Sequence, residues 1–214
     1  MITLATTKNQ VRALLDDAAA DRFGDDLLEA AARLALQGID AQLPNILSLA
    51  HTVVTAGRDQ SITSMAACLY LMDLFVQRAA EDPPLSGVEY SSTLRTDTLQ
   101  IHFSGSHIPQ TGEILQLTYA ARHTLSGLDL AVSTTLPDAL APALDYGTAA
   151  HACLIRAASL AEAYAARPGE SSRLAERAGV LLDLFKMVLD GIKNFGAPVF
   201  PQGFALDSWE GGSL

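Results

Sequence analysis

The sequence predicts an α+β fold that is mainly helical: a four-helix bundle with a small inserted antiparallel β-domain and an extended C-terminal arm. Three observations lead to this prediction. Apolar residues recur with the period of a helix near both ends of the chain, in residues 8–43 and 137–193. Between them, from about 48 to 135, apolar residues come in short, β-rich runs separated by Gly, Pro and Ser. Residues 195–214 show neither period.

Composition excludes several classes of protein. The 214 residues are 49% apolar and 18% charged, so the chain is expected to bury a core rather than to be disordered. The net charge of −10 is spread along the chain, without the basic stripe of a nucleic-acid binder. Neither a membrane helix nor a signal peptide is expected from the apolar runs. Cys68 and Cys153 are expected to be buried thiols of a cytoplasmic protein.

Residues 1–47 are predicted to supply the first two helices of the bundle. The first begins near Thr7, which has the form of a capping box because Gln10 follows three residues later. An apolar stripe then follows, consisting of Val11, Leu14, Leu15 and Ala18. The second helix starts after Gly24 with two carboxylates in its first turn, where the helix dipole favours them. Pro44 is predicted to end it.

The inserted β-domain is predicted over residues 48–135, with strands at 51–56, 69–76, 98–104 and 114–120. The last two strands alternate cleanly, which predicts an inward face made of Leu99, Ile101, Phe103, Leu115, Leu117 and Tyr119. A turn-rich loop at 105–112 joins them, so they are predicted to pair as a hairpin. The run 69–76 is ambiguous by period alone, and a helix is its alternative.

Residues 136–194 are predicted to complete the bundle with two long helices. Thr134 or Thr135 can cap the first of them, and Pro137 suits its first turn. The sequence breaks at 167–169, and the last helix then carries an apolar stripe from Leu174 to Ile192. Because the connection is short, the two helices are expected to be antiparallel.

The predicted arm, 195–214, contains prolines and glycines that prevent a regular helix, and it also contains four large aromatic residues. A merely solvated tail would be polar. The arm is therefore expected to dock, on its own domain or on a neighbour, through the predicted partner-binding residues Phe195, Phe200, Phe204 and Trp209.

No complete catalytic or cofactor-binding motif stands in the sequence, so neither a catalytic residue nor a cofactor is predicted. The alternative is a metal-dependent or other enzyme with a site near His102, His107 and Glu113, which a hairpin would bring together; exposed histidines are the simpler interpretation. The paired carboxylates Asp16–Asp17 and Asp25–Asp26 are attributed to a solvated surface and a helix start. A ligand-sensing transcription factor would need a basic helix-turn-helix, and residues 8–43 are acidic.

Two segments carry a family resemblance. The first is Val11-Arg-Ala-Leu-Leu-Asp-Asp17 followed by Phe23-Gly-Asp-Asp-Leu-Leu28, and the second runs from Leu115 to Asp129 and on to Thr134-Thr-Leu-Pro137. With the order of the zones, these segments resemble tailed-bacteriophage head-to-tail adaptor proteins, also called connector or neck proteins. In that pattern Gly24 stands where Ser is usual. The resemblance spans roughly residues 8–193 as a pattern of elements.

The resemblance implies a structural virion protein: a homo-oligomeric, twelve-fold ring in the virion neck, made in the host cytoplasm. The implied partners are the portal protein, a tail or stopper protein, and other copies of the chain. Genomic DNA would pass through the lumen without sequence-specific binding, and no membrane is involved. The acidic balance agrees, because like charge prevents DNA from adhering to a channel wall. A stopper or tail-terminator protein is the alternative within the same class.

Overall fold

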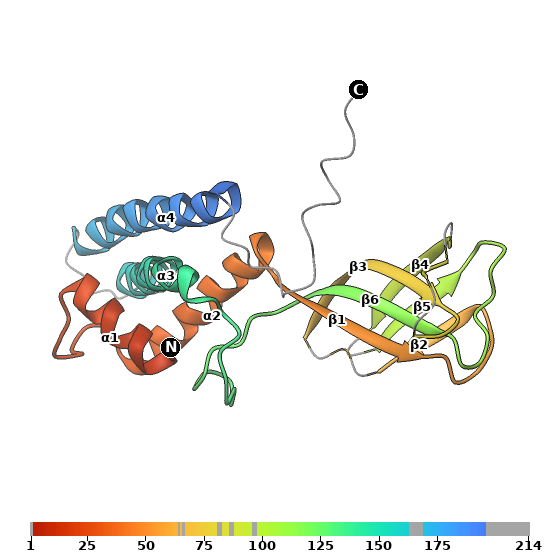
Figure 1. The fold of residues 1–214 in the computed structure, drawn as a ribbon. Coiled ribbons are helices and arrows are strands. Elements are labelled where there is room, and N and C mark those ends of the chain that lie inside the picture. Colours follow the sequence, from red (N-terminus) through yellow and green to blue (C-terminus); the bar gives the residue numbers. More distant parts are fainter. Residues whose placement is uncertain are drawn as a thin grey trace, which may run out of the picture. The chain divides into compact units, whose positions relative to one another are not determined.

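The computed structural model describes residues 2–63, 65, 67–80, 83–85, 88–95, 98–162 and 169–195. These residues form two compact units (Figure 1). The first is helical and combines residues 2–45 with 123–195, and the second contains the strands and comprises residues from 46 to 122. The chain is therefore α+β, as predicted, and its β unit is inserted between two parts of a helical unit.

Helix α1 spans Leu4–Leu15, and α2 spans Asp25–Gln42. The predicted start of α1 is too late, because the capping box is made one turn earlier, by Thr3 and Thr6. The Thr6 N–H donates to Thr3 Oγ1 at 3.2 Å, and the Thr3 N–H donates to Thr6 Oγ1 at 2.9 Å. Helix α2 follows Gly24 with Asp25 and Asp26 in its first turn, as predicted.

The turn between α1 and α2 is organised by a buried carboxylate. The Phe23 N–H donates to Asp17 Oδ2 at 2.9 Å, and the Arg22 N–H donates to Asp17 Oδ1 at 3.2 Å. Attributing Asp17 to a solvated surface was therefore wrong. The backbone donors of a buried turn need acceptors, and this side chain supplies them.

The other long helices are α3, Ala141–Glu162, and α4, Glu170–Phe195. Helix α3 packs against both α2 and α4 (Figure 1). It does not start at Pro137; that residue caps the short 3-10 turn η1, Asp138–Leu140, and α3 follows directly. Cys153 is buried as expected, whereas Cys68 is half-buried. Within the described ranges, no helix combines the length and apolarity that crossing a membrane requires.

Among the described residues, the β unit contains six strands: β1 Asn45–Thr52, β2 Asp59–Ile62, β3 Cys68–Gln77, β4 Tyr90–Arg95, β5 Thr98–Phe103 and β6 Ile114–Ala121. They make two three-stranded sheets with the orders β1-β6-β3 and β2-β5-β4. The ambiguous run at 69–76 is therefore a strand. The first strand lies earlier in the chain than the predicted 51–56, and it follows α2 almost directly.

The predicted hairpin of 98–104 with 114–120 was wrong, because β5 and β6 belong to different sheets. Strand β5 pairs with β2 and β4, and β6 pairs with β3, all antiparallel. The segment 105–112 crosses between the sheets, and its Gly112 N–H donates to Val53 O at 2.9 Å. Alternation shows which face of a strand is buried, but it does not show which other strand pairs with it. The predicted inward face is correct, since all six of its residues are buried in one core: Leu99, Ile101, Phe103, Leu115, Leu117 and Tyr119.

The segment 123–135 belongs to the helical unit, so the predicted domain boundary at 136 lies too late in the chain. The His123 N–H donates to Asp40 Oδ1 at 2.8 Å, and the His123 ring contacts the Leu43 carbonyl at 3.0 Å. Leu125 and Leu128 are buried in the core that the helices share. These contacts bind the segment to α2, which local sequence pattern does not reveal.

Candidate interaction surfaces

The predicted partner-binding aromatics are Phe195, Phe200, Phe204 and Trp209. The last three lie outside the described residues. Phe195 is the final residue of α4, and the description does not extend to its side chain. Their role in binding a partner therefore stays a prediction.

Of the three residues in the alternative enzyme site, two are in contact. The Nε2 atom of His107 lies 2.9 Å from Oε2 of Glu113, while His102 Nδ1 lies 2.7 Å from Asp59 Oδ1 on β2. Glu113 also accepts the Gln110 N–H at 3.0 Å, so its buried carboxylate holds the crossing segment in place. Across the described part of the chain, no group of three His, Cys, Asp or Glu side chains could hold a metal ion.

An apolar tip, residues 129–132, projects from the segment that follows the β unit. Leu130 and Val132 are 97% and 94% exposed, the most exposed large apolar side chains described. The backbone at the tip is unusual, since Asp129 has φ 50° and Leu130 has φ 64°. The left-handed region is costly for residues with a Cβ, and two in succession point to a constrained turn.

The apolar tip is anchored to α2 by a two-bond ion pair. Arg33 donates to Asp129 Oδ1 from Nη2 at 2.7 Å and from Nε at 2.9 Å. These hydrogen bonds hold the pKa of Asp129 below its usual range. The Gly127 N–H also donates to Ala131 O at 2.9 Å, which closes the turn. The tip therefore presents two apolar side chains on a fixed support.

A second exposed surface, the outer face of α4, carries Val180 and Met187. They lie seven residues apart on one side of the helix and are 64% and 63% exposed. Lys186 and Lys193 are also exposed on α4. The ion pairs formed by the described residues include neither lysine. Asp183 and Asp190 are exposed on the same side of α4, so this face combines apolar groups with charges of both signs.

A third exposed surface lies in the β unit, on the outward side of β3. Tyr70, Met72 and Phe75 project from that strand, and each is about half exposed. Strand β3 is at the edge of its sheet, next to β6. Exposed aromatic side chains on an edge strand are suited to contact with another chain.

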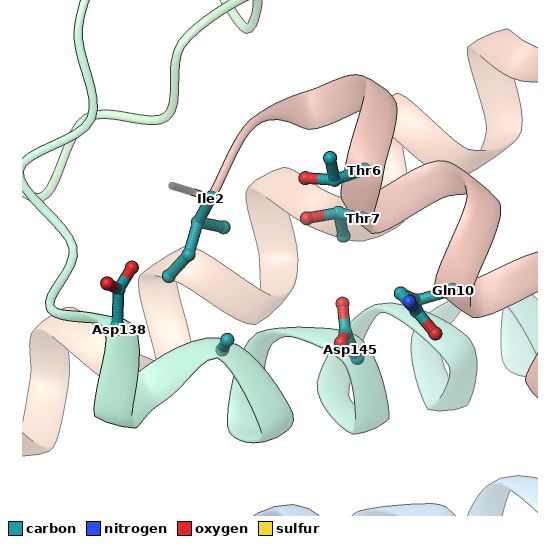
Figure 2. Close-up of a pocket in the computed structure, with 7 residues that line it drawn as sticks. Ile2, Thr6, Thr7, Gln10, Asp138 and Asp145 are labelled. Carbon is teal, nitrogen blue, oxygen red and sulfur yellow. The ribbon is translucent and has the colours of Figure 1, made fainter.

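A polar pocket of about 310 Å³ lies in the helical unit between α1 and the start of α3 (Figure 2). Its lining consists of Ile2, Thr6, Thr7, Gln10, Asp138, Ala141 and Asp145. Burial raises the pKa of the Asp145 carboxyl to about 6. Across the pocket, the Thr7 hydroxyl is buried and has no hydrogen-bond partner in the described part of the chain.

Sequence reasoning missed both the apolar tip and the pocket, although each left a signal. Leu130 and Val132 are large apolar residues within a turn-rich stretch, where an exposed position is common. Asp145 is an acid in the interior of an Ala-rich helix. The sequence did not indicate that α1 would bury it.

No family model matches the sequence, and no curated protein matches it. Among solved structures, a chain in the neck of an empty gene transfer agent (GTA) particle computed with C6 symmetry is 21% identical; the match covers 82% of this chain and 87% of that one, with a TM-score of 0.31. A chain in the virion of a native GTA particle is 22% identical, with coverages of 81% and 87% and a TM-score of 0.33. A chain in the native GTA neck computed with C12 symmetry is 22% identical, with coverages of 82% and 86% and a TM-score of 0.30. These particles have a neck, the kind of assembly that the sequence resemblance names, but TM-scores this low carry no argument from fold.

Proposed function

We propose that this chain is a structural protein of a virion neck, a head-to-tail adaptor. Twelve copies form a ring that joins the portal to the tail or stopper protein, and genomic DNA passes through the ring. The resemblance in sequence to adaptor proteins is the starting point, and it implies a helical unit with a β unit inserted. The order of the two units along the chain supports that implication.

The observation that carries the proposal is the apolar tip. Leu130 and Val132 are almost fully exposed to solvent, yet the Arg33–Asp129 ion pair fixes the turn that presents them. A rigid apolar anchor loses little conformational entropy when it enters a pocket, which is the property of a docking element. The outer faces of α4 and β3 offer further apolar surface for contacts between subunits.

The charge of the chain suits a DNA channel. The net charge of −10 is spread along the sequence, which contains no basic stripe of the kind that neutralises phosphates. DNA repelled by the channel wall passes without adhering, whereas a basic wall would retain it.

The direct test is assembly with the portal ring encoded in the same genome. Purified full-length chain mixed with that portal is expected to form a ring on it, detected by light scattering and negative-stain microscopy. The paired change Leu130→Ser with Val132→Ser is expected to weaken assembly at least tenfold without lowering the melting temperature. The matched control is Val54→Ser, which removes another exposed apolar side chain. Wild-type chain that does not bind the intact portal would contradict the proposal.

The predicted arm needs a separate test. Replacing Phe200, Phe204 and Trp209 by Ser is expected to leave melting unchanged and to abolish docking on the portal. Gln202→Ala, in the same segment, is the control. A truncated chain without 195–214 that binds the portal normally, or that fails to fold, would show that the arm has another role.

A further inference from the structure

The pocket between α1 and α3 is acidic and lacks an internal counter-charge. Asp138 and Asp145 line it, and its lining contains no Lys, Arg or His. Burial alone accounts for the raised pKa of Asp145, with no hydrogen bond or charge from the described residues to offset it. A half-buried carboxylate without a partner is unfavourable in the free chain.

A second polar group in the pocket is also unsatisfied. Thr7 is 2% exposed, and its hydroxyl forms no hydrogen bond within the described part of the chain. Figure 2 shows Thr7 and Asp145 facing each other across the pocket, one from α1 and one from α3. Buried polar groups in folded proteins almost always have a hydrogen-bond partner. A carboxylate and a hydroxyl acceptor together match a ligand that donates hydrogen bonds and carries positive charge.

We propose that this pocket receives the ammonium group of a lysine from a second copy of the chain, presented by the outer face of α4. The proposal rests on the proposed function to the extent that copies assemble into a ring. Such a contact would pair the Asp145 carboxylate and give the Thr7 hydroxyl a donor.

An acidic pocket calls for a basic occupant that forms no ion pair in the free chain. Four basic residues in the first two helices and the turn between them already form ion pairs: Lys8, Arg12, Arg22 and Arg33. Lys186 and Lys193 on α4 form none with described residues, and Lys186 adjoins the exposed Met187. A lysine beside an apolar side chain can enter a neighbour's pocket while that side chain covers its rim.

The position of the two surfaces agrees with a ring. No residue of α4 lines the pocket, although α4 contacts α1 elsewhere, where Arg177 donates to the Leu14 carbonyl at 2.6 Å. A contact between two different surfaces of identical chains is heterologous, and repetition of it closes a ring when the rotation permits. A pocket meeting its own copy would instead place carboxylates together.

The first experiment compares Asp145→Asn with Glu162→Gln, which neutralises an exposed acid at the far end of α3. Both full-length variants are assembled on the portal ring and measured by light scattering. Asp145→Asn is expected to weaken ring formation at least tenfold while the free chain melts at the same or a higher temperature. Glu162→Gln is expected to assemble like wild type. Normal assembly by Asp145→Asn would overturn the proposal.

The second experiment identifies the occupant by exchanging charges. Lys186→Glu and Lys193→Glu are made singly, and then each is combined with Asp145→Lys. For the lysine that enters the pocket, the single change is expected to block the ring and the combination to restore it. If neither combination restores assembly, the cation comes from another protein and the proposal is wrong. If wild-type chain forms no ring on the portal, the proposed function fails first, and this contact fails with it.

Discussion

Gly147 of α3 lies directly against the phenyl ring of Phe185 on α4. A Cβ atom at residue 147 would be 3.1 Å from Phe185 Cδ2 and 3.0 Å from the Cβ of Ala35 on α2. The other edge of the ring contacts Gly38 of α2, where an added Cβ would lie 3.1 Å from Phe185 Cζ. The ring therefore fills a space that exists because two helices carry glycine there, and it joins α2, α3 and α4 in one core.

This packing predicts that Gly147→Ala destabilises the helical unit. Ala normally favours a helix over Gly by about 0.5–1 kcal/mol, but a methyl group enclosed by Ala35 and Phe185 overpacks the core at a cost of about 1–3 kcal/mol. Gly179→Ala on α4 is the control, because open space surrounds that residue and only the helix preference acts. Urea unfolding should give opposite signs for the two variants. A gain in stability for Gly147→Ala would show that the ring can move aside.

The buried carboxylate of Asp17 is predicted to hold the turn between α1 and α2. Asp17→Ala leaves the N–H groups of Arg22 and Phe23 without their acceptor, which is expected to lower the free energy of unfolding by about 1–3 kcal/mol. The neighbouring Asp16→Asn removes a charge at an exposed position and keeps a side chain that tolerates the left-handed backbone there. Chemical denaturation measures the free energy of unfolding of both variants. Equal losses would mean that the negative charge, rather than the hydrogen bonds of Asp17, stabilises the turn.

The pKa of Asp145 predicts a pH dependence with a definite sign. Burial raises the folded-state pKa from 3.8 to about 6, so the folded chain binds more protons than the unfolded chain between those values. Stability from this group therefore falls as pH rises from about 4 to 6, and it stays low above that. Asp145→Asn should match wild type near pH 4 and be more stable near pH 7. A stability difference between the two proteins that does not change with pH would contradict the raised pKa.

The turn at Leu130 gives a prediction that separates folding from assembly. With φ at 64°, Leu130→Gly removes the Cβ conflict of the left-handed region and is expected to be about 1 kcal/mol more stable than Leu130→Ser. Both variants remove the exposed apolar side chain, so both are expected to bind the portal more weakly. Thermal melting and portal binding measured on the same samples test this. A loss of stability for Leu130→Gly would mean that the side chain has a partner in the free chain.

Periodicity in the sequence was enough to predict the helical zones, the β-rich zone between them and the inward faces of β5 and β6. It was not enough to predict strand pairing, because the alternation of Phe103 and Leu115 is the same whether their strands pair or face each other across a core. Nor does it reveal long-range hydrogen bonds such as that from His123 to Asp40, which assigns residues 123–135 to the helical unit.

The candidate sites also depend on long-range contacts that local sequence patterns do not reveal. The aromatic residues of the predicted arm stood out by composition alone, whereas Leu130 became notable only with the ion pair between Arg33 and Asp129, 96 residues apart. Asp145 likewise became notable only because it lines a pocket together with Thr7, which lies on a different helix. Functional features that depend on two distant segments cannot be derived from the local pattern of either one.

The core of the β unit gives the last prediction, which compares two side chains of strand β5. Phe103 is 0% exposed and lies in the core between the sheets, so Phe103→Ala is expected to cost about 3–5 kcal/mol, as truncation of a buried aromatic does. Gln100 is exposed on the other face of the same strand, and Gln100→Ala is expected to change stability by less than about 0.5 kcal/mol. Because the two residues share a strand, any difference reports the face that each side chain occupies. Urea unfolding followed by circular dichroism measures both, and comparable losses would show that the two faces of β5 were wrongly assigned.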